Sequence, residues 1–278
     1  MTYDDLRDGF RSDPSGSIAS PPFTHARYKA AFDLTLNGHF RKTPGRYCLE
    51  EFFLQLPDAN SAIIIDPDAD NATALAKFVV ANRNFEILGT NADIADFSWD
   101  TINGGVKMET GSADNDQLIF LPHLDTKQTA WAGVLWGTEN QVIWEAQVIT
   151  QAAIVTMLIW AGLKLSNTPT IATDDDQVFF RYDTDVPDAN WQCVSSIGGT
   201  ATTTDSGVVV AVSTAYNLRI EIDSDRKAHF FINDVHVTQT TALTNDVDLI
   251  PYVGIQQLSS GDSSMTLCYQ KISRILFE

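Results

Sequence analysis

Short apolar runs separated by turn residues follow one another from about Phe78 to the C-terminus. In the clearest of them Leu218, Ile220 and Ile222 alternate with polar neighbours. Apolar side chains at every second position indicate a β-strand with one buried face. About ten to twelve such strands, with almost no helical periodicity between them, exceed an immunoglobulin-like domain. The pattern predicts an all-β fold, a double-sheet antiparallel jelly-roll sandwich.

One hairpin can be placed from the sequence, because Asn233 and Asp234 both tolerate the positive φ that a two-residue turn requires. Pairing across this turn makes His229 and His236 diagonal neighbours on one face of the sheet. Two imidazoles at that spacing are potential metal ligands, although two surface histidines without a metal are the favoured interpretation.

The chain before the apolar runs has a different character. Proline, glycine, serine and aspartate interrupt the first 24 residues, and residues 47–56 fit either one helix or one strand. We therefore expect an irregular N-terminal arm over residues 1–77, followed by a sandwich domain over residues 78–278.

Charge is distributed unevenly along the chain, whose formal net charge is −18. So acidic a protein is a poor binder of nucleic acid, because phosphate contacts require a cationic surface. Residues 21–49 nevertheless hold five cations against Asp33 alone. We predict that these cations dock on an acidic partner surface, the alternative being an ordinary solvated segment: Arg27, Lys29, Arg41, Lys42 and Arg46.

The three cysteines, Cys48, Cys193 and Cys268, are far apart and form no CxxC pattern. Reduced thiols in a protein made in a reducing cytoplasm are the simplest interpretation. The first residues show no signal peptide, and the longest apolar stretch, around residues 152–163, is too short to span a bilayer. We therefore expect no membrane partner.

Consecutive carboxylates at Asp174, Asp175 and Asp176 precede a predicted strand. Calcium binds oxygen ligands from loops of this kind, so a calcium site is one hypothesis, and an ordinary solvated acidic loop is the more common outcome. We therefore expect no cofactor, with calcium at these carboxylates as a possibility.

The search for catalytic residues gives one isolated candidate, Glu145. Jelly-roll glycan hydrolases carry paired acids on one strand face, but the expected partner positions hold Gln147 and Thr150. No GxSxG or P-loop motif is present. We therefore predict that the protein is not an enzyme.

Three tryptophans near predicted loops, Trp131, Trp136 and Trp191, are candidates for stacking against sugar rings. That function requires exposed indole rings. Packing at the edges of the sandwich, or in a subunit interface, is the favoured alternative.

Several segments together resemble a known family: TGSADNDQLIFLPH, WEAQVIT, DDDQVFFRYDTDVPDANWQCVSSIGGTATTTDSGVVVA, YNLRIEIDSDRKAHFFINDVHV and PYVGIQ. From residue 78 to the end the chain resembles the concanavalin A-like (LamG-like) jelly-roll domains of tailed-bacteriophage structural proteins. The resemblance lies in the order of the predicted strands and in the residue pattern of these segments. It includes no complete set of metal ligands or catalytic residues.

The resemblance implies a virion structural protein made in the host cytoplasm. The most specific role that the resemblance implies is that of a decoration or cement protein on the outer surface of the phage head. The arm would bind the major capsid protein or another virion protein, and copies of the chain would associate, with a trimer as the expected homo-oligomer. The alternative is a glycan-binding module of a tail or fibre that contacts host-surface glycans, and a jelly-roll glycan hydrolase is less favoured.

Overall fold

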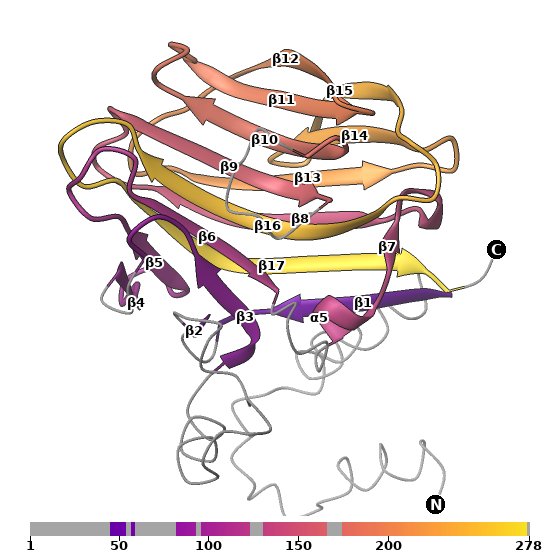
Figure 1. The fold of residues 1–278 in the computed structure, drawn as a ribbon, viewed down its shortest axis with the longest axis horizontal. Helices are drawn as coiled ribbons and strands as arrows, with labels where there is room; N and C mark the ends of the chain where they lie inside the picture. The colour runs from indigo at the N-terminus through magenta and orange to yellow at the C-terminus, as the bar shows by residue number, and fades with distance from the viewer. Residues whose placement is uncertain are drawn as a thin grey trace, which may run out of the picture. The chain divides into compact units, whose positions relative to one another are not determined.

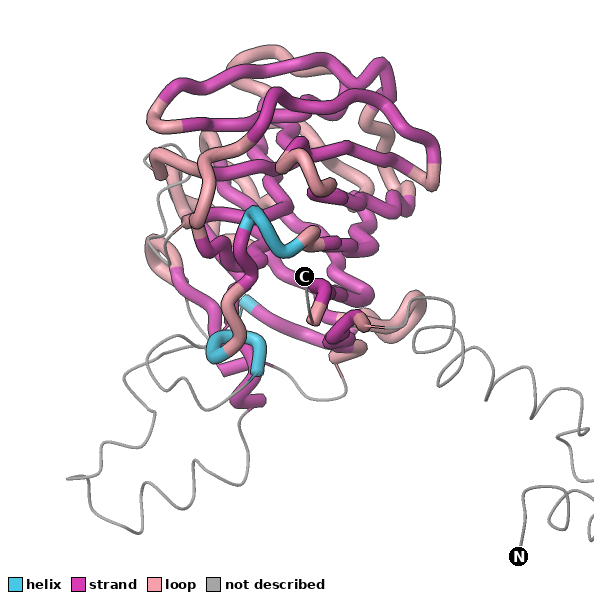
Figure 2. Tube along the Cα trace, turned by 90° about the vertical axis from the view of Figure 1, so that its right-hand side faces the viewer, coloured by secondary structure: helices cyan, strands magenta, loops and turns pink. Residues whose placement is uncertain are grey.

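The computed structural model describes residues 45–53, 57–58, 82–92, 96–122, 130–165 and 174–276. Strands make up most of this part of the chain (Figure 2). They form two sheets, here called sheet A and sheet B, that pack face to face (Figure 1). The predicted all-β double-sheet sandwich is confirmed.

Sheet A has eight strands. In spatial order they are β15 (Val235–Ala242), β14 (Lys227–Ile232), β13 (Ala215–Ile222), β8 (Ile143–Thr150), β17 (Ser264–Ile275), β5 (Val106–Glu109) and β4 (Phe97–Trp99), with β1 (Arg46–Glu51) also paired to β17.

Sheet B has nine strands. In spatial order they are β12 (Thr200–Val209), β11 (Asn190–Ile197), β10 (Gln177–Asp183), β9 (Met157–Lys164), β16 (Asp248–Gln257), β6 (Gln117–Pro122), β3 (Asn82–Leu88) and β2 (Pro57–Asp58), with β7 (Trp136–Gly137) also paired to β16. The pairing of β2 with β3 is parallel, whereas the pairings along the rest of sheet B, from β12 to β3, are antiparallel. Two short helices, α5 (Ala130–Gly133) and η4 (Thr138–Asn140), flank β7.

The chain repeatedly passes from one sheet to the other. The connections β8 to β9, β12 to β13, β15 to β16 and β16 to β17 each change sheet. As a result β17 lies between β8 and β5, and β16 lies between β9 and β6. The central pairings are therefore between strands far apart in the sequence, which is typical of jelly-roll sandwiches.

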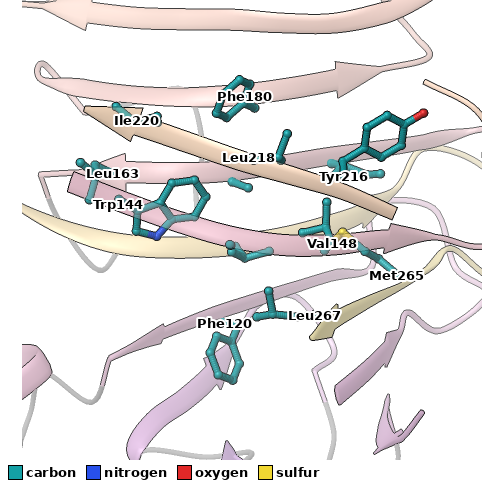
Figure 3. Close-up of a cluster of buried hydrophobic side chains, with 14 of the residues drawn as sticks. Phe120, Trp144, Val148, Leu163, Phe180, Tyr216, Leu218, Ile220, Met265 and Leu267 are labelled. Carbon is teal, nitrogen blue, oxygen red and sulfur yellow. The ribbon is translucent and has the colours of Figure 1, made fainter. Parts of the chain in front are cut away.

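The core lies between the sheets and follows the predicted alternation. In β8 Trp144, Ala146 and Val148 are fully buried, and the residues between them are partly exposed. Leu218 and Ile220 of β13 point into the same interior (Figure 3). Burial of each large apolar side chain stabilises a fold by about 1.5–3 kcal/mol, so this shared interior is the main stabilising feature of the sandwich.

The structure corrects the predicted domain boundary. Contacts divide the chain between Arg46 and Tyr47, and β1, which lies inside the predicted arm, pairs with β17 of sheet A. Phe53 packs in the core at 5.0 Å from Phe120, ring centroid to centroid. The apolar run at residues 47–56 is thus partly a strand of the sandwich, so a boundary after residue 77 is too late. The irregular character of residues 1–44 lies outside the described residues and stays a prediction.

The predicted hairpin turn is confirmed. Asn233 and Asp234 have φ of 50° and 65°, and they join β14 to β15. The pairing then shifts by one residue, so that Phe231 faces His236 but His229 faces Gln239. Within the described chain no helix is long and apolar enough to cross a membrane.

A glycine in β9 permits close packing inside sheet B. A Cβ added at Gly162 would lie 2.4 Å from the Val178 carbonyl oxygen and 2.6 Å from the Phe179 Cα. These are backbone atoms that cannot move without disturbing β10.

We expect Gly162→Ala to lower the free energy of unfolding by about 1–3 kcal/mol, because the methyl group overpacks the strand pair. Urea unfolding measures this change. Thr202→Ala on the exposed strand β12 is the control and should stay within about 0.5 kcal/mol of the wild type. An unchanged midpoint for Gly162→Ala would contradict the close approach.

Candidate functional site

The predicted cationic docking residues fall mostly outside the described chain. Arg27, Lys29, Arg41 and Lys42 lie there, and only Arg46 is described, as the partly buried first residue of β1. Docking through these cations therefore stays a prediction.

The three tryptophans considered for sugar stacking are buried, so their rings are not available to stack against a sugar. Trp131, Trp136 and Trp191 are 4%, 1% and 0% exposed. The Trp136 indole N–H donates to the Trp131 carbonyl at 3.0 Å, and the Trp191 ring packs edge-on against Tyr216. Rings with this apolar area gain more from the core than from water, which agrees with the alternative interpretation.

The three consecutive aspartates do not converge. Asp174 is buried beside Lys164, the Asp175 side chain is exposed, and Asp176 accepts a hydrogen bond from the Thr244 hydroxyl. Among the described residues no group of three or more histidine, cysteine or carboxylate side chains is placed to hold a metal ion. The geometry thus provides no shared calcium site for these three carboxylates.

Glu145 lies on the outer face of sheet A, because its neighbours in β8 point into the core. Its carboxylate accepts a hydrogen bond from the Tyr269 hydroxyl at 2.5 Å. Burial raises the pKa of Tyr269, and the hydrogen bond to Glu145 raises it further. Gln147 instead donates to Asn217 at 2.8 Å, so no second acid joins Glu145 from the predicted positions.

Part of the outer face of sheet B, over β6, β9, β10, β11 and β16, is buried as well as the inner face. We call this second group the outer cluster, and it consists of Ile119, Leu121, Trp160, Phe179, Val194 and Tyr252 together with the polar residues Lys164, Asp174 and Gln177. The register explains how they meet. Lys164 of β9 pairs with Gln177 of β10. On the other side of β9, Tyr252 of β16 pairs with Gly162, two residues before Lys164.

A buried ion pair lies at one end of the outer cluster. The Lys164 Nζ is 3.8 Å from the Asp174 Oδ2, and both side chains are at most 5% exposed. The same Nζ lies 5.3 Å from the centroid of the Tyr252 ring. Burial lowers the pKa of Lys164, against the opposing effect of Asp174. Burial, followed by the Asp174 charge, raises the pKa of Tyr252 well above its usual value.

Three polar atoms of the outer cluster have no hydrogen-bond partner in the described structure: the Trp160 Nε1, the Gln177 Oε1 and the Tyr252 hydroxyl. An unsatisfied buried polar group costs about 1–3 kcal/mol. Aromatic rings beside a few unsatisfied donors and acceptors are typical of a site for a polar ligand. Trp160 and Tyr252 are 0% exposed, however, so this face is closed to solvent in the structure.

One feature of the sequence indicates this cluster. The segment around residues 152–163 is apolar at almost every position, which is typical of a strand buried on both faces. Lys164 follows directly and is buried, so a charged residue at the end of such a run indicated a buried polar site. The identity of its partners depended on the strand order β10–β9–β16.

A double-mutant cycle tests the buried pair. Asp174→Asn removes the carboxylate that offsets the burial of the Lys164 ammonium, and we expect it to lower the free energy of unfolding by about 3 kcal/mol. The double variant Lys164→Met/Asp174→Asn should recover most of this loss. Urea unfolding gives both values, with Asp185→Asn in an exposed loop as the control. A double variant as unstable as Asp174→Asn alone would show that the pair is not coupled.

Comparison with known proteins gives no relative by sequence: no protein-family profile matches the chain, and no curated protein matches it. Solved structures are similar in fold. A protein of unknown function from Shewanella oneidensis MR-1 aligns with a TM-score of 0.53 at 12% identity, over 91% of this chain and 95% of its own.

Two further structures are similar. One comes from work on endo-acting O-glycanases of the human gut microbiota, with a TM-score of 0.51 at 6% identity over 82% of this chain and 98% of its own. The other is the family 7 alginate lyase A1-II′, with a TM-score of 0.48 at 15% identity over 66% of this chain and 84% of its own. At these identities the likeness concerns the fold alone. The two-sheet architecture, together with the Shewanella and gut-microbiota structures, gives the chain a concanavalin A-like jelly-roll fold.

Proposed function

We propose that the chain is a non-enzymatic structural protein of a bacteriophage virion, a decoration protein that attaches to the outer surface of the head through its N-terminal segment. The observation that carries this proposal is the division of charge. Residues 21–49 have five cations and one anion, whereas the whole chain has 18 cations against 36 anions. A cationic segment joined to an acidic body favours attachment through that segment to an acidic surface.

The outer face of sheet A supports a role without catalysis, because its charged side chains are engaged with one another. The Arg219 guanidinium bridges Glu221 and Asp234 at 3.1 and 3.0 Å. Glu145, the candidate acid, accepts a hydrogen bond from Tyr269. Groups held in such pairs are typical of a surface that stabilises the sheet.

Association of several copies is supported by the edge strands. β12 and β15 contact each other at one end of the sandwich (Figure 1). Residues 200–205 of β12 are all exposed, and the strand contains no lysine or proline. Long edge strands without such residues favour pairing with another chain, so a homo-oligomer, with a trimer as the expected form, is part of the proposal.

The attachment is tested on purified virions that lack the chain. We expect Arg41→Glu/Lys42→Glu to weaken co-sedimentation with these particles by about tenfold, which corresponds to about 1.4 kcal/mol. The matched control Lys77→Glu/Lys128→Glu makes the same change of charge outside the cationic segment. Wild-type binding should also fall as salt is raised, because salt screens exposed charges. Equal binding by both double variants, or absence of the chain from virions in antibody-labelled electron micrographs, would refute the proposal.

The second candidate function, glycan binding, is favoured by one observation, the three unsatisfied polar atoms beside the rings of Trp160 and Tyr252. It ranks below the first because these side chains are buried and the three tryptophans first considered are part of the core.

A glycan array with the full chain, with and without calcium, tests this second function. If a glycan is bound through the outer cluster, Tyr252→Phe should lower its affinity by about tenfold, since the ligand loses one hydrogen bond. Tyr269→Phe on sheet A is the control and should bind normally. An array without any bound glycan would dismiss this candidate.

A further inference from the structure

The hairpin of β14 and β15 brings two histidine rings together on the outer face of sheet A. The His229 Nδ1 lies 3.3 Å from the His236 Nε2, and the ring centroids are 5.4 Å apart. Both the turn at Asn233–Asp234 and the one-residue shift in β15 set this approach. The His236 ring is exposed, so ions in solution can reach the pair.

Asp223 fixes which nitrogen of His229 is available. Its Oδ2 lies 2.9 Å from the His229 Nε2, while its Oδ1 accepts the backbone N–H groups of Asp225 and Lys227, each at 2.8 Å. A carboxylate oxygen at this distance accepts the proton of Nε2, which leaves the Nδ1 lone pair directed toward His236.

We propose that the His229 Nδ1 and the His236 Nε2 bind a zinc ion, with water molecules as the remaining ligands. Two nitrogens bound tetrahedrally at 2.0–2.1 Å lie about 3.3 Å apart, which agrees with the spacing of this pair. A square-planar ion with similar bond lengths brings adjacent nitrogens to about 2.9 Å, so the spacing favours zinc over copper.

The surroundings of the pair suit a cation. A carboxylate on the second nitrogen of a ligating histidine orients the ring and raises its basicity, which is the position of Asp223. Glu221 lies directly opposite His229 in the sheet. The Arg219 guanidinium, on the neighbouring strand β13, is paired with both Glu221 and Asp234 and lies 4.4 Å from the centroid of the Phe231 ring.

Zinc binding is measured on the full chain by competition with a chromogenic zinc indicator, using zinc chloride as the ion. We expect one strong equivalent per chain. Replacing a ligand, in His229→Gln or His236→Gln, should weaken this binding by about 100-fold or more, and Asp223→Asn should weaken it by about tenfold. His39→Gln and His123→Gln are the matched controls and should bind like the wild type.

A spectroscopic measurement assigns the atoms. Zinc should shift the 15N resonances of the His229 Nδ1 and the His236 Nε2, and circular dichroism without zinc should show that each variant keeps the wild-type fold. Gln239→His adds an imidazole opposite His229 and should tighten binding. The proposal is overturned if the wild type binds no zinc, or if zinc affinity is the same in the wild type and in both ligand variants. Neither result bears on attachment to virions, so the two proposals fail independently.

Discussion

Close packing of two sheets across one dry interior is the constraint on which the rest of the structure depends. Each core strand must direct alternate side chains inward, and Trp144, Leu218 and Phe180 do so from three different strands (Figure 3). Because side chains along a strand alternate between its two faces, the residues between them must lie on an outer face. The chemistry of the protein is therefore divided between the outer faces of sheets A and B and the edge strands.

The two outer faces have opposite characters. On sheet A, Glu145, Arg219 and His229 remain partly exposed and pair with their neighbours. On sheet B, Trp160 and Tyr252 are fully buried, and the strands that carry them are apolar on both sides. Exposed polar groups retain access to ions and partners, whereas the buried groups of sheet B contribute mainly to the stability of the fold. This difference is why the metal proposal rests on sheet A and why glycan binding through sheet B is the weaker candidate.

Features that depend on short-range rules could be predicted from the sequence. The alternation of Leu218, Ile220 and Ile222 gave the half-buried strand, and Asn233–Asp234 gave the turn. Tryptophan exposure could not be predicted in this way. Trp191 lies near a loop in the sequence, yet its position in β11 directs its ring into the core, where Tyr216 of the opposite sheet covers it. Burial at such positions depends on which strand lies across the interior, and local sequence does not contain that information.

The same distinction separates the two candidate sites. His229 and His236 lie on strands joined by a two-residue turn, so the turn type and the strand period suffice to place them on one face. Tyr252 joins Lys164 and Asp174 only because β16 crosses back to pair with β9. That pairing is a property of the whole jelly roll, since the chain changes sheets twice between the two strands, from β12 to β13 and from β15 to β16. A local motif thus indicates the histidine pair, whereas the aromatic partner of the buried lysine follows from the topology.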